Sequence, residues 1–191
     1  DENAAEKGGF KHFMLKEMYE QPEVLKNILA KRIQKDGEIF FDTIDKKFQK
    51  KLRKVERVSM ISCGTAYHAG LVGSIAMEQY ARIPCQTQVS SEFRYGDPIL
   101  NSKDLVVLIT QSGETADTLA AMREAKAKGA LTLAIVNVVG STIAREADAV
   151  IYTHAGPEIG VASTKAYMAQ LATLLLFAFY MTRIRKNFPL T

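Results

Sequence analysis

The chain has 191 residues, of which 47% are hydrophobic and 24% are charged, and its formal net charge at pH 7 is +4. This is an ordinary globular composition, so we expect a well-filled core in one domain or in a domain with an appendage. The positive charge is too mild to support nucleic-acid binding, and we expect no nucleic-acid partner.

The two cysteines, Cys63 and Cys85, have no metal-type spacing. Two buried free thiols in a reducing cytosol are the favoured interpretation, although a disulfide or a catalytic cysteine stays open. No signal peptide is visible, and the most apolar stretch, residues 171–181, is far shorter than the ~20 residues that span a bilayer. The sequence begins with Asp1. We therefore expect a cytoplasmic piece of a longer protein, with no membrane partner.

Residues 1–57 are unusually polar, because they hold 25 of the 46 charged side chains. Residues 1–9 lack periodicity and should be loose. A helix is expected over residues 10–19, and Pro22 should start a second one, since proline fits the first turn of a helix but not its interior. We expect a helical arm over residues 1–57 and a core domain over residues 58–191.

A third helix in the arm is indicated by an apolar stripe at helical spacing, formed by Ile44, Phe48, Leu52 and Val55. The opposite face is basic and carries Lys46, Lys47, Lys50, Lys51, Arg53 and Lys54. Such a face could contact RNA. Because it has no interleaved exposed aromatic residues, a solvated helix face is favoured.

After the arm, strands alternate with helices. Strands are expected over residues 58–62, 86–90, 105–110, 131–137 and 149–152. Helices are expected over residues 67–80, 115–128, 141–146 and about 161–184. This alternation is typical of a parallel sheet joined by right-handed crossovers, which is an α/β fold.

The order of the five strands follows from their polarity. The first, third and fourth are strongly apolar and should lie in the middle of the sheet, buried on both faces, whereas the second and fifth are short or polar, as edge strands are. The order 2-1-3-4-5 satisfies both conditions and is the flavodoxin-like doubly wound arrangement. In that arrangement a ligand crevice opens at the carboxyl ends of the first and third strands.

Two loops line this crevice, over residues 63–68 and 110–115, and both are rich in small and hydroxyl residues. Each precedes a helix, whose first turn offers unpaired N–H groups and partial positive charge. Gly113 would let the backbone approach an anion closely. Phosphate is the expected ligand. Alternatively, the Ser-x-x-Thr pattern of this loop could be a simple helix cap. The side-chain donors would be Thr65, Gln111, Ser112 and Thr115.

Several other classes of site lack their motifs. The P-loop motif, G-x-G-x-x-G and G-x-S-x-G are all absent, which disfavours a nucleotide triphosphatase, a dinucleotide-binding fold and an α/β-hydrolase. The three histidines are scattered, so a zinc site has no support. A third loop, residues 153–164, precedes the last helix. Glu158 is its only carboxylate, and it could be a base or, slightly preferred, a helix cap.

Four motifs carry a resemblance to a known family: CGTAYHAG, SEFRYGDP, TQSGETADTL and EIGVASTKAY. In this order they resemble the first sugar-isomerase (SIS) domain of the glutamine–fructose-6-phosphate aminotransferases, also called glucosamine-6-phosphate synthases. The segment GFKHFMLKEMYEQP resembles the lead into that domain. The resemblance covers nearly all of the chain and implies an SIS fold.

The resemblance implies a role in amino-sugar synthesis. The full enzymes join a glutaminase domain to an isomerase module of two SIS domains and convert fructose 6-phosphate and ammonia to glucosamine 6-phosphate, without metal or organic cofactor, usually as dimers or larger assemblies. The expected phosphate-binding residues are Thr110, Gln111, Ser112, Gly113 and Thr115. The expected sugar-binding residues are Gly64, Thr65, Ala66, Val161, Ala162 and Ser163. Many members have serine where this chain has Ala66, so one hydrogen bond to the phosphate is lost.

The same resemblance implies that this chain lacks the catalytic groups. In the family, the glutamate, lysine and histidine of the chemistry belong to the second SIS domain, so we expect binding of sugar phosphate with little or no turnover, and no catalytic residue here beyond the weak candidate Glu158. Two alternatives stay open: a non-catalytic SIS sensor of phosphosugars, and a phosphosugar isomerase complete in one domain. The last helix is apolar on nearly every side, so we expect it to be covered by this domain, by a second domain or by another copy of the chain in a homodimer.

Overall fold

The computed structural model describes residues 6–186, so most of the segment predicted to be loose lies outside the described residues. Strands alternate with helices from residue 57 onward, as expected. The elements in chain order are α1 (Phe13–Arg32), α2 (Lys46–Leu52), β1 (Arg57–Ser62), α3 (Thr65–Ala76), the π-helical turn η2 (Met77–Ala81), β2 (Cys85–Val89), α4 (Ser90–Tyr95), β3 (Asp104–Thr110), α5 (Ala116–Ala127), β4 (Leu131–Val136), α6 (Thr142–Glu146), β5 (Ala149–Tyr152) and α7 (Lys165–Arg185).

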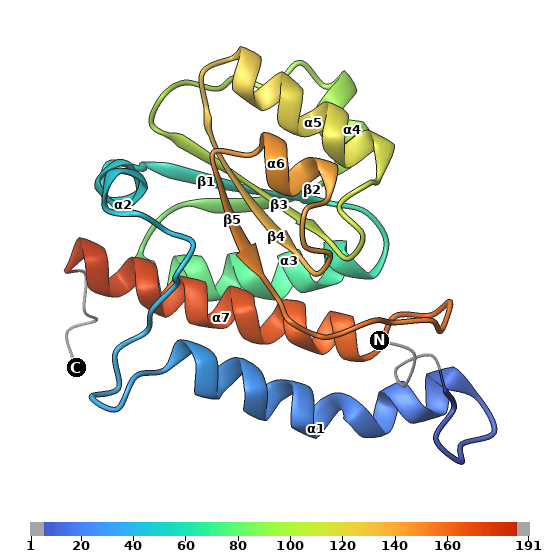
Figure 1. The fold of residues 1–191 in the computed structure, drawn as a ribbon. Coiled ribbons are helices and arrows are strands. Elements are labelled where there is room, and N and C mark those ends of the chain that lie inside the picture. Colours follow the sequence, from blue (N-terminus) through green and yellow to red (C-terminus); the bar gives the residue numbers. More distant parts are fainter. Residues whose placement is uncertain (1–5, 187–191) are drawn as a thin grey trace.

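The five strands form one parallel sheet in the order β2-β1-β3-β4-β5, which confirms the predicted topology. Helices α3 and α7 cover one face of the sheet, and α4, α5 and α6 cover the other (Figure 1). Every residue of β3 and β4 is buried. These two strands therefore lie in the middle of the fold, and their carboxyl ends open on one edge of it.

The arm packs on the domain as an additional layer. Figure 1 shows α1 running alongside α7, on the side of α7 away from the sheet. Val24 and Ile28 of α1 belong to the same buried cluster as Phe177 of α7, and so does Phe48 of α2. The basic side chains of α2 point to solvent, as the favoured interpretation expected. The arm thus contributes apolar surface to the core of the domain.

The break predicted at Pro22 is wrong, because α1 continues from Phe13 to Arg32 with Pro22 inside it. A proline cannot donate to the carbonyl four residues before it, which here belongs to Met18. The side-chain amide of Gln21 donates to that carbonyl instead, at 3.1 Å. The lost backbone hydrogen bond is therefore replaced, and the helix is not interrupted.

The last helix also begins later than predicted, at Lys165 instead of near residue 161. Thr164 has φ −126° and ψ −78°, so the backbone is not helical there. The short helix α4 was not predicted, since it is too short to carry a clear periodic signal. The helix predicted over residues 67–80 is present as α3, but its last part is the π-helical turn η2, which ends at Ala81 and is followed by Arg82 with φ +56°.

Helix α7 is apolar on most of its surface, as predicted. By length and hydropathy it would pass as a membrane span, but 61% of its most apolar window is buried within the described structure. It lies between α3 and α1 and keeps two large side chains exposed, Leu175 (42%) and Phe179 (37%). This is the pattern of a core helix that also reaches the surface.

Candidate functional site

A cavity of about 440 Å³ opens at the carboxyl ends of β1 and β3, where the predicted topology requires a crevice. Its walls come from the loop after β1, the loop after β3, and the segment before α7. The lining residues are Cys63, Gly64, Thr65, Ala66, Ile109, Thr110, Gln111, Ser112, Thr115, Thr118, Val161, Ala162, Ser163 and Gln170. The structure therefore brings together every predicted binding residue except Gly113.

Gly113 shapes the turn after β3 and does not line the cavity. Its φ is +73°, and a Cβ atom at this position would lie 2.2 Å from the Ser141 Oγ atom. Its N–H donates to the Thr110 hydroxyl at 3.2 Å, and its carbonyl accepts from the Ile143 N–H at 3.2 Å. The turn is thereby held against the loop that precedes α6, and no residue but glycine fits this position without displacing a neighbour.

The hydroxyl groups of the turn keep their protons available. Ser112 Oγ accepts from the Glu114 N–H at 3.2 Å, which leaves its own O–H free to donate into the cavity. The hydroxyls of Thr110 and Thr115 lie 3.4 Å apart, so one hydroxyl can donate to the other. The hydroxyl that accepts this hydrogen bond keeps its own proton free to donate to a ligand. The turn is therefore set up as a hydrogen-bond donor before any ligand arrives.

Two helix N-termini face the cavity without a side-chain cap. Neither α3, which follows Gly64, nor α5, which follows Thr115, receives a capping hydrogen bond from a side chain. Apart from the Tyr67 N–H, which donates to the Gly64 carbonyl at 3.1 Å, the first-turn N–H groups of these two helices have no side-chain acceptor among the described residues and carry partial positive charge. An anion held between the two loops would satisfy both helices at once.

The third helix at the site is already capped, and Glu158 is the cap. Its carboxylate accepts from the Thr164 N–H at 2.8 Å, the Ala166 N–H at 3.1 Å and the Ser163 hydroxyl at 2.9 Å. Glu158 does not line the cavity. This geometry favours the helix-cap interpretation over the role of a base.

No aspartate, glutamate, lysine, arginine or histidine is among the lining residues. The neighbouring carboxylate, Glu114, is turned away and accepts from the Thr142 N–H at 2.7 Å. That backbone hydrogen bond lowers the pKa of Glu114, so this side chain stays ionised outside the cavity. Any anion bound here is thus held by neutral donors and helix dipoles.

The segment before α7 is fixed by two side chains that the sequence did not single out. The Asn137 Oδ1 accepts from the Ala155 N–H at 2.8 Å, and its Nδ2 donates to the Gly156 carbonyl at 2.7 Å. Glu17 of α1 is 2% exposed and accepts from the N–H groups of Ile159 at 2.6 Å and Gly160 at 3.1 Å. One wall of the cavity therefore depends on the arm.

A second contact ties the arm to the same wall. Lys165, the first residue of α7, is 6% exposed and forms an ion pair with Glu20 of α1. A buried charge needs such a partner, because burying it alone would be costly. Nothing in the spacing of HFMLKEMYEQP revealed these roles, since a carboxylate on a surface helix normally points to solvent.

The two cysteines are free thiols and are half-buried. Cys63 lines the cavity, whereas Cys85 lies at the start of β2, away from it. Burial raises the pKa of Cys85 to about 12, so this thiol stays protonated in the physiological range. Among residues 6–186, no group of three or more histidine, cysteine or acidic side chains could hold a metal ion.

The comparisons with known proteins agree with this geometry. The model of the SIS domain family matches residues 51–180, which include the sheet and both uncapped helices. This chain belongs to the SIS domain family.

Relatives of this SIS domain carry a more specific name. A glutamine–fructose-6-phosphate aminotransferase (isomerizing) of Caldanaerobacter subterraneus is 55% identical over 93% of the chain, and one of Streptomyces coelicolor is 51% identical over 97%. The chain spans about 29% and 30% of the length of these relatives. Among solved structures, the C-terminal domain of the aminotransferase of Francisella tularensis is similar, with a TM-score of 0.90 and 41% identity. That likeness covers 97% of this chain and 51% of the other.

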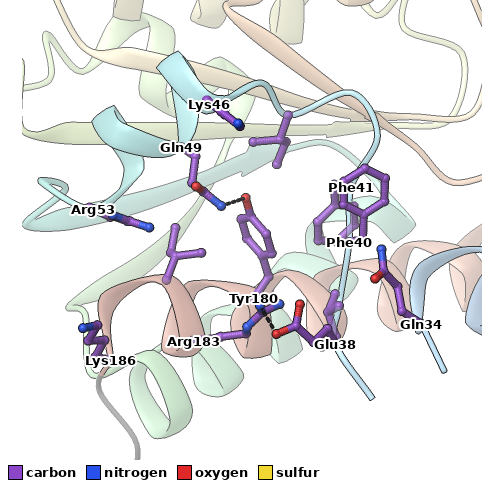
Figure 2. Close-up of a pocket in the computed structure, with 13 residues that line it drawn as sticks. Gln34, Glu38, Phe40, Phe41, Lys46, Gln49, Arg53, Tyr180, Arg183 and Lys186 are labelled. Atoms are coloured by element: carbon purple, nitrogen blue, oxygen red, sulfur yellow. Dashed lines mark hydrogen bonds and ion pairs between the residues drawn. The ribbon is translucent and has the colours of Figure 1, made fainter. Parts of the chain in front are cut away.

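The structure has a second cavity, of about 420 Å³, between the arm and the opposite end of α7 (Figure 2). Figure 2 shows a basic rim around it, formed by Lys46, Arg53, Arg183 and Lys186. Arg183 pairs with Glu38, and Gln49 donates to the Tyr180 hydroxyl at 2.9 Å. Basic side chains surround this cavity, whereas the hydrogen-bond donors that line the first are neutral. The second cavity therefore serves as a control in tests of where an anion binds.

The role of Glu17 in fastening the cavity wall leads to a prediction. Replacing Glu17 with alanine should lower the free energy of unfolding by about 3 kcal/mol, because two N–H groups lose a charged acceptor in a buried place. Amide hydrogen exchange of Ile159 and Gly160 should accelerate at the same time. The matched control is Glu23→Ala on the same helix, where an exposed ion pair with Lys26 should contribute almost nothing. Equal losses in both variants would contradict the assignment.

Proposed function

We propose that this chain is the sugar-phosphate-binding half of the isomerase module of a glutamine–fructose-6-phosphate aminotransferase. The observation that carries the proposal is the neutral cavity between two uncapped helix N-termini, lined by the hydroxyls of Thr65, Ser112 and Thr115. A phosphate group would accept from these hydroxyls and from the main-chain N–H groups. The sugar chain would extend toward the wall formed by residues 161–163.

The relatives support this assignment, because they are named as aminotransferases of this kind and because the chain matches only one part of each. Because the chain spans less than a third of their length, the complete reaction would need regions beyond those matched here. In our proposal these are a glutaminase domain, which supplies ammonia, and a second SIS domain. The whole enzyme would convert fructose 6-phosphate to glucosamine 6-phosphate in the cytoplasm.

The proposed chemistry would not be completed within this chain. Moving a proton between the first two sugar carbons needs a base within hydrogen-bond reach. No carboxylate, histidine or lysine is among the lining residues, and Glu158 is committed to capping α7. The chain should therefore bind sugar phosphate without turning it over.

The test is calorimetric titration with fructose 6-phosphate together with assays of isomerisation and of glucosamine 6-phosphate formation. Binding without turnover is the expected result. Robust isomerisation by the chain alone would favour the one-domain isomerase instead, and absence of binding would end the proposal. A purely sensory role would give the same binding, but reassembly with the second SIS domain would then restore no activity.

A substitution at Ala66 is expected to raise the affinity for the ligand. Ala66 lines the cavity at the start of α3, where a serine hydroxyl could donate to the phosphate. Ala66→Ser should therefore raise the affinity for fructose 6-phosphate about tenfold, the effect of one hydrogen bond to a charged group. Ala76→Ser, at the far end of the same helix, is the control and should leave the affinity unchanged. Equal affinities of all three proteins would place the phosphate elsewhere.

We also propose that the chain self-associates through its exposed apolar surface. Val72 and Ile75 of α3 are 52% and 64% exposed, and Leu175 and Phe179 of α7 are exposed as well. Exposed apolar residues on two neighbouring helices are typical of an interface. Sedimentation at high concentration should give the mass of a dimer, and a monomer at all concentrations would refute this part of the proposal.

A further inference from the structure

Gln170 is a polar residue in an apolar part of α7. It is 3% exposed, and it lines the cavity from the second turn of the helix. Its neighbour Ala169 is fully buried in the core. Its side-chain Oε1 atom is buried and has no hydrogen-bond partner among residues 6–186.

Such an atom is costly for folding. A buried amide oxygen has given up its hydrogen bonds to water, and the protein offers no replacement. A leucine of similar size would pack at this position without that penalty. The fold therefore does not explain why a glutamine stands here, and an unsatisfied buried polar group requires an explanation, for which a ligand is one candidate.

The other unpartnered side-chain atoms of the described structure do not share this location. They belong to Thr43, Ser62, Thr87, Ser141, Thr164 and Arg185, and none of these residues lines the cavity. Thr118, which does line it, is already engaged by the Ser90 hydroxyl at 2.9 Å. Within the described residues, Gln170 alone combines an orphaned polar atom with a place in the cavity wall.

The chemistry of the unpartnered Gln170 Oε1 atom determines which group of a ligand can hydrogen-bond to it. An amide oxygen is an acceptor, so its partner must be a donor. A phosphate dianion has only acceptor oxygens and cannot fill this role, whereas every hydroxyl of a sugar can donate. The terminal torsion of a glutamine is soft, so the amide can turn this oxygen toward a hydroxyl in the cavity.

We propose that Gln170 hydrogen-bonds a hydroxyl of the bound sugar and so makes the cavity select a polyhydroxylated phosphate ester over a simple one. This inference rests on the proposed function, because it assumes that a sugar phosphate is the ligand. It assigns recognition of the sugar to α7 and recognition of the phosphate to the turn after β3. The two parts can therefore be separated by experiment.

The experiment measures two ligands against the same variants by calorimetric titration. The ligands are fructose 6-phosphate and ethyl phosphate, which carries the phosphate without sugar hydroxyls. Gln170→Leu should weaken fructose 6-phosphate binding about tenfold and leave ethyl phosphate binding unchanged. Thr173→Val is the control, because Thr173 is a buried polar residue of the same helix that does not line the cavity, and it should change neither affinity.

The outcomes distinguish this inference from the proposed function. Equal weakening of both ligands, or no change in either, would overturn the role of Gln170. If the unaltered chain binds neither ligand, the proposed function fails first. Should Gln170→Leu not fold, Gln170→Met, whose flexible side chain fills a similar volume, takes its place with the same expected result.

Discussion

Replacing Ser112 with alanine and Thr115 with valine in one chain should reduce the affinity for fructose 6-phosphate by about a hundredfold or more. Each change removes a hydroxyl that lines the cavity. A hydrogen bond to a charged group contributes about 1.5–3 kcal/mol, and each 1.4 kcal/mol corresponds to about tenfold in affinity. Calorimetric titration measures the loss directly, and circular dichroism checks that the variant is folded.

The basic second cavity provides the control for this prediction. If simple charge attraction captured the phosphate, Lys46→Ala combined with Arg53→Ala would remove binding, because both residues stand on the rim of that cavity. We expect this double variant to retain the full affinity. Loss of binding in the rim variant, with binding retained in the Ser112 and Thr115 variant, would contradict the assignment of the site.

Replacing Gly113 with alanine should lower the free energy of unfolding by about 3 kcal/mol and abolish sugar-phosphate binding. The position has φ +73°, and the added Cβ would lie 2.6 Å from the Ser141 Cβ and 2.9 Å from a Val136 methyl group. Left-handed backbone costs about 1–2 kcal/mol in a non-glycine residue, and overpacking costs about 1–3 kcal/mol more. Urea denaturation gives the loss of stability.

A substitution at Gly129 separates the cost of backbone strain from the cost of overpacking. Its φ is +80°, close to that of Gly113, but a Cβ there would meet nothing within 4 Å. Gly129→Ala should therefore cost only about 1 kcal/mol, from backbone strain alone, and should leave ligand binding intact. If the two alanine variants lose equal stability, the close approach of the turn to Ser141 has no energetic importance.

Much of the fold was predictable because it depends on local apolar patterns. The runs at residues 105–110 and 131–137 are almost entirely apolar, with Thr132 as the one polar residue inside them, which is typical of a strand buried on both faces, and they form β3 and β4. The polar second strand became the edge strand β2. Once that order was set, the position of the crevice followed from the topology.

The remaining features depend on contacts between distant residues, which a local pattern does not contain. The continuity of α1 through Pro22 depends on a side-chain hydrogen bond from Gln21. The late start of α7 reflects a preceding segment that is fastened by Glu17, more than 140 residues away in the sequence. Gln170 was not predicted as a binding residue, because a single glutamine in an apolar helix carries no motif and glutamines are mostly exposed.

The account rests on the claim that neutral hydroxyls and main-chain N–H groups at the first cavity hold the phosphate. The most direct measurement is a crystal structure of the chain soaked with fructose 6-phosphate. We expect the phosphate between the N-termini of α3 and α5, with oxygen atoms within hydrogen-bond distance of Ser112 and Thr115. A phosphate found on the basic rim at Lys46 and Arg53, with the first cavity free of ligand, would contradict the account.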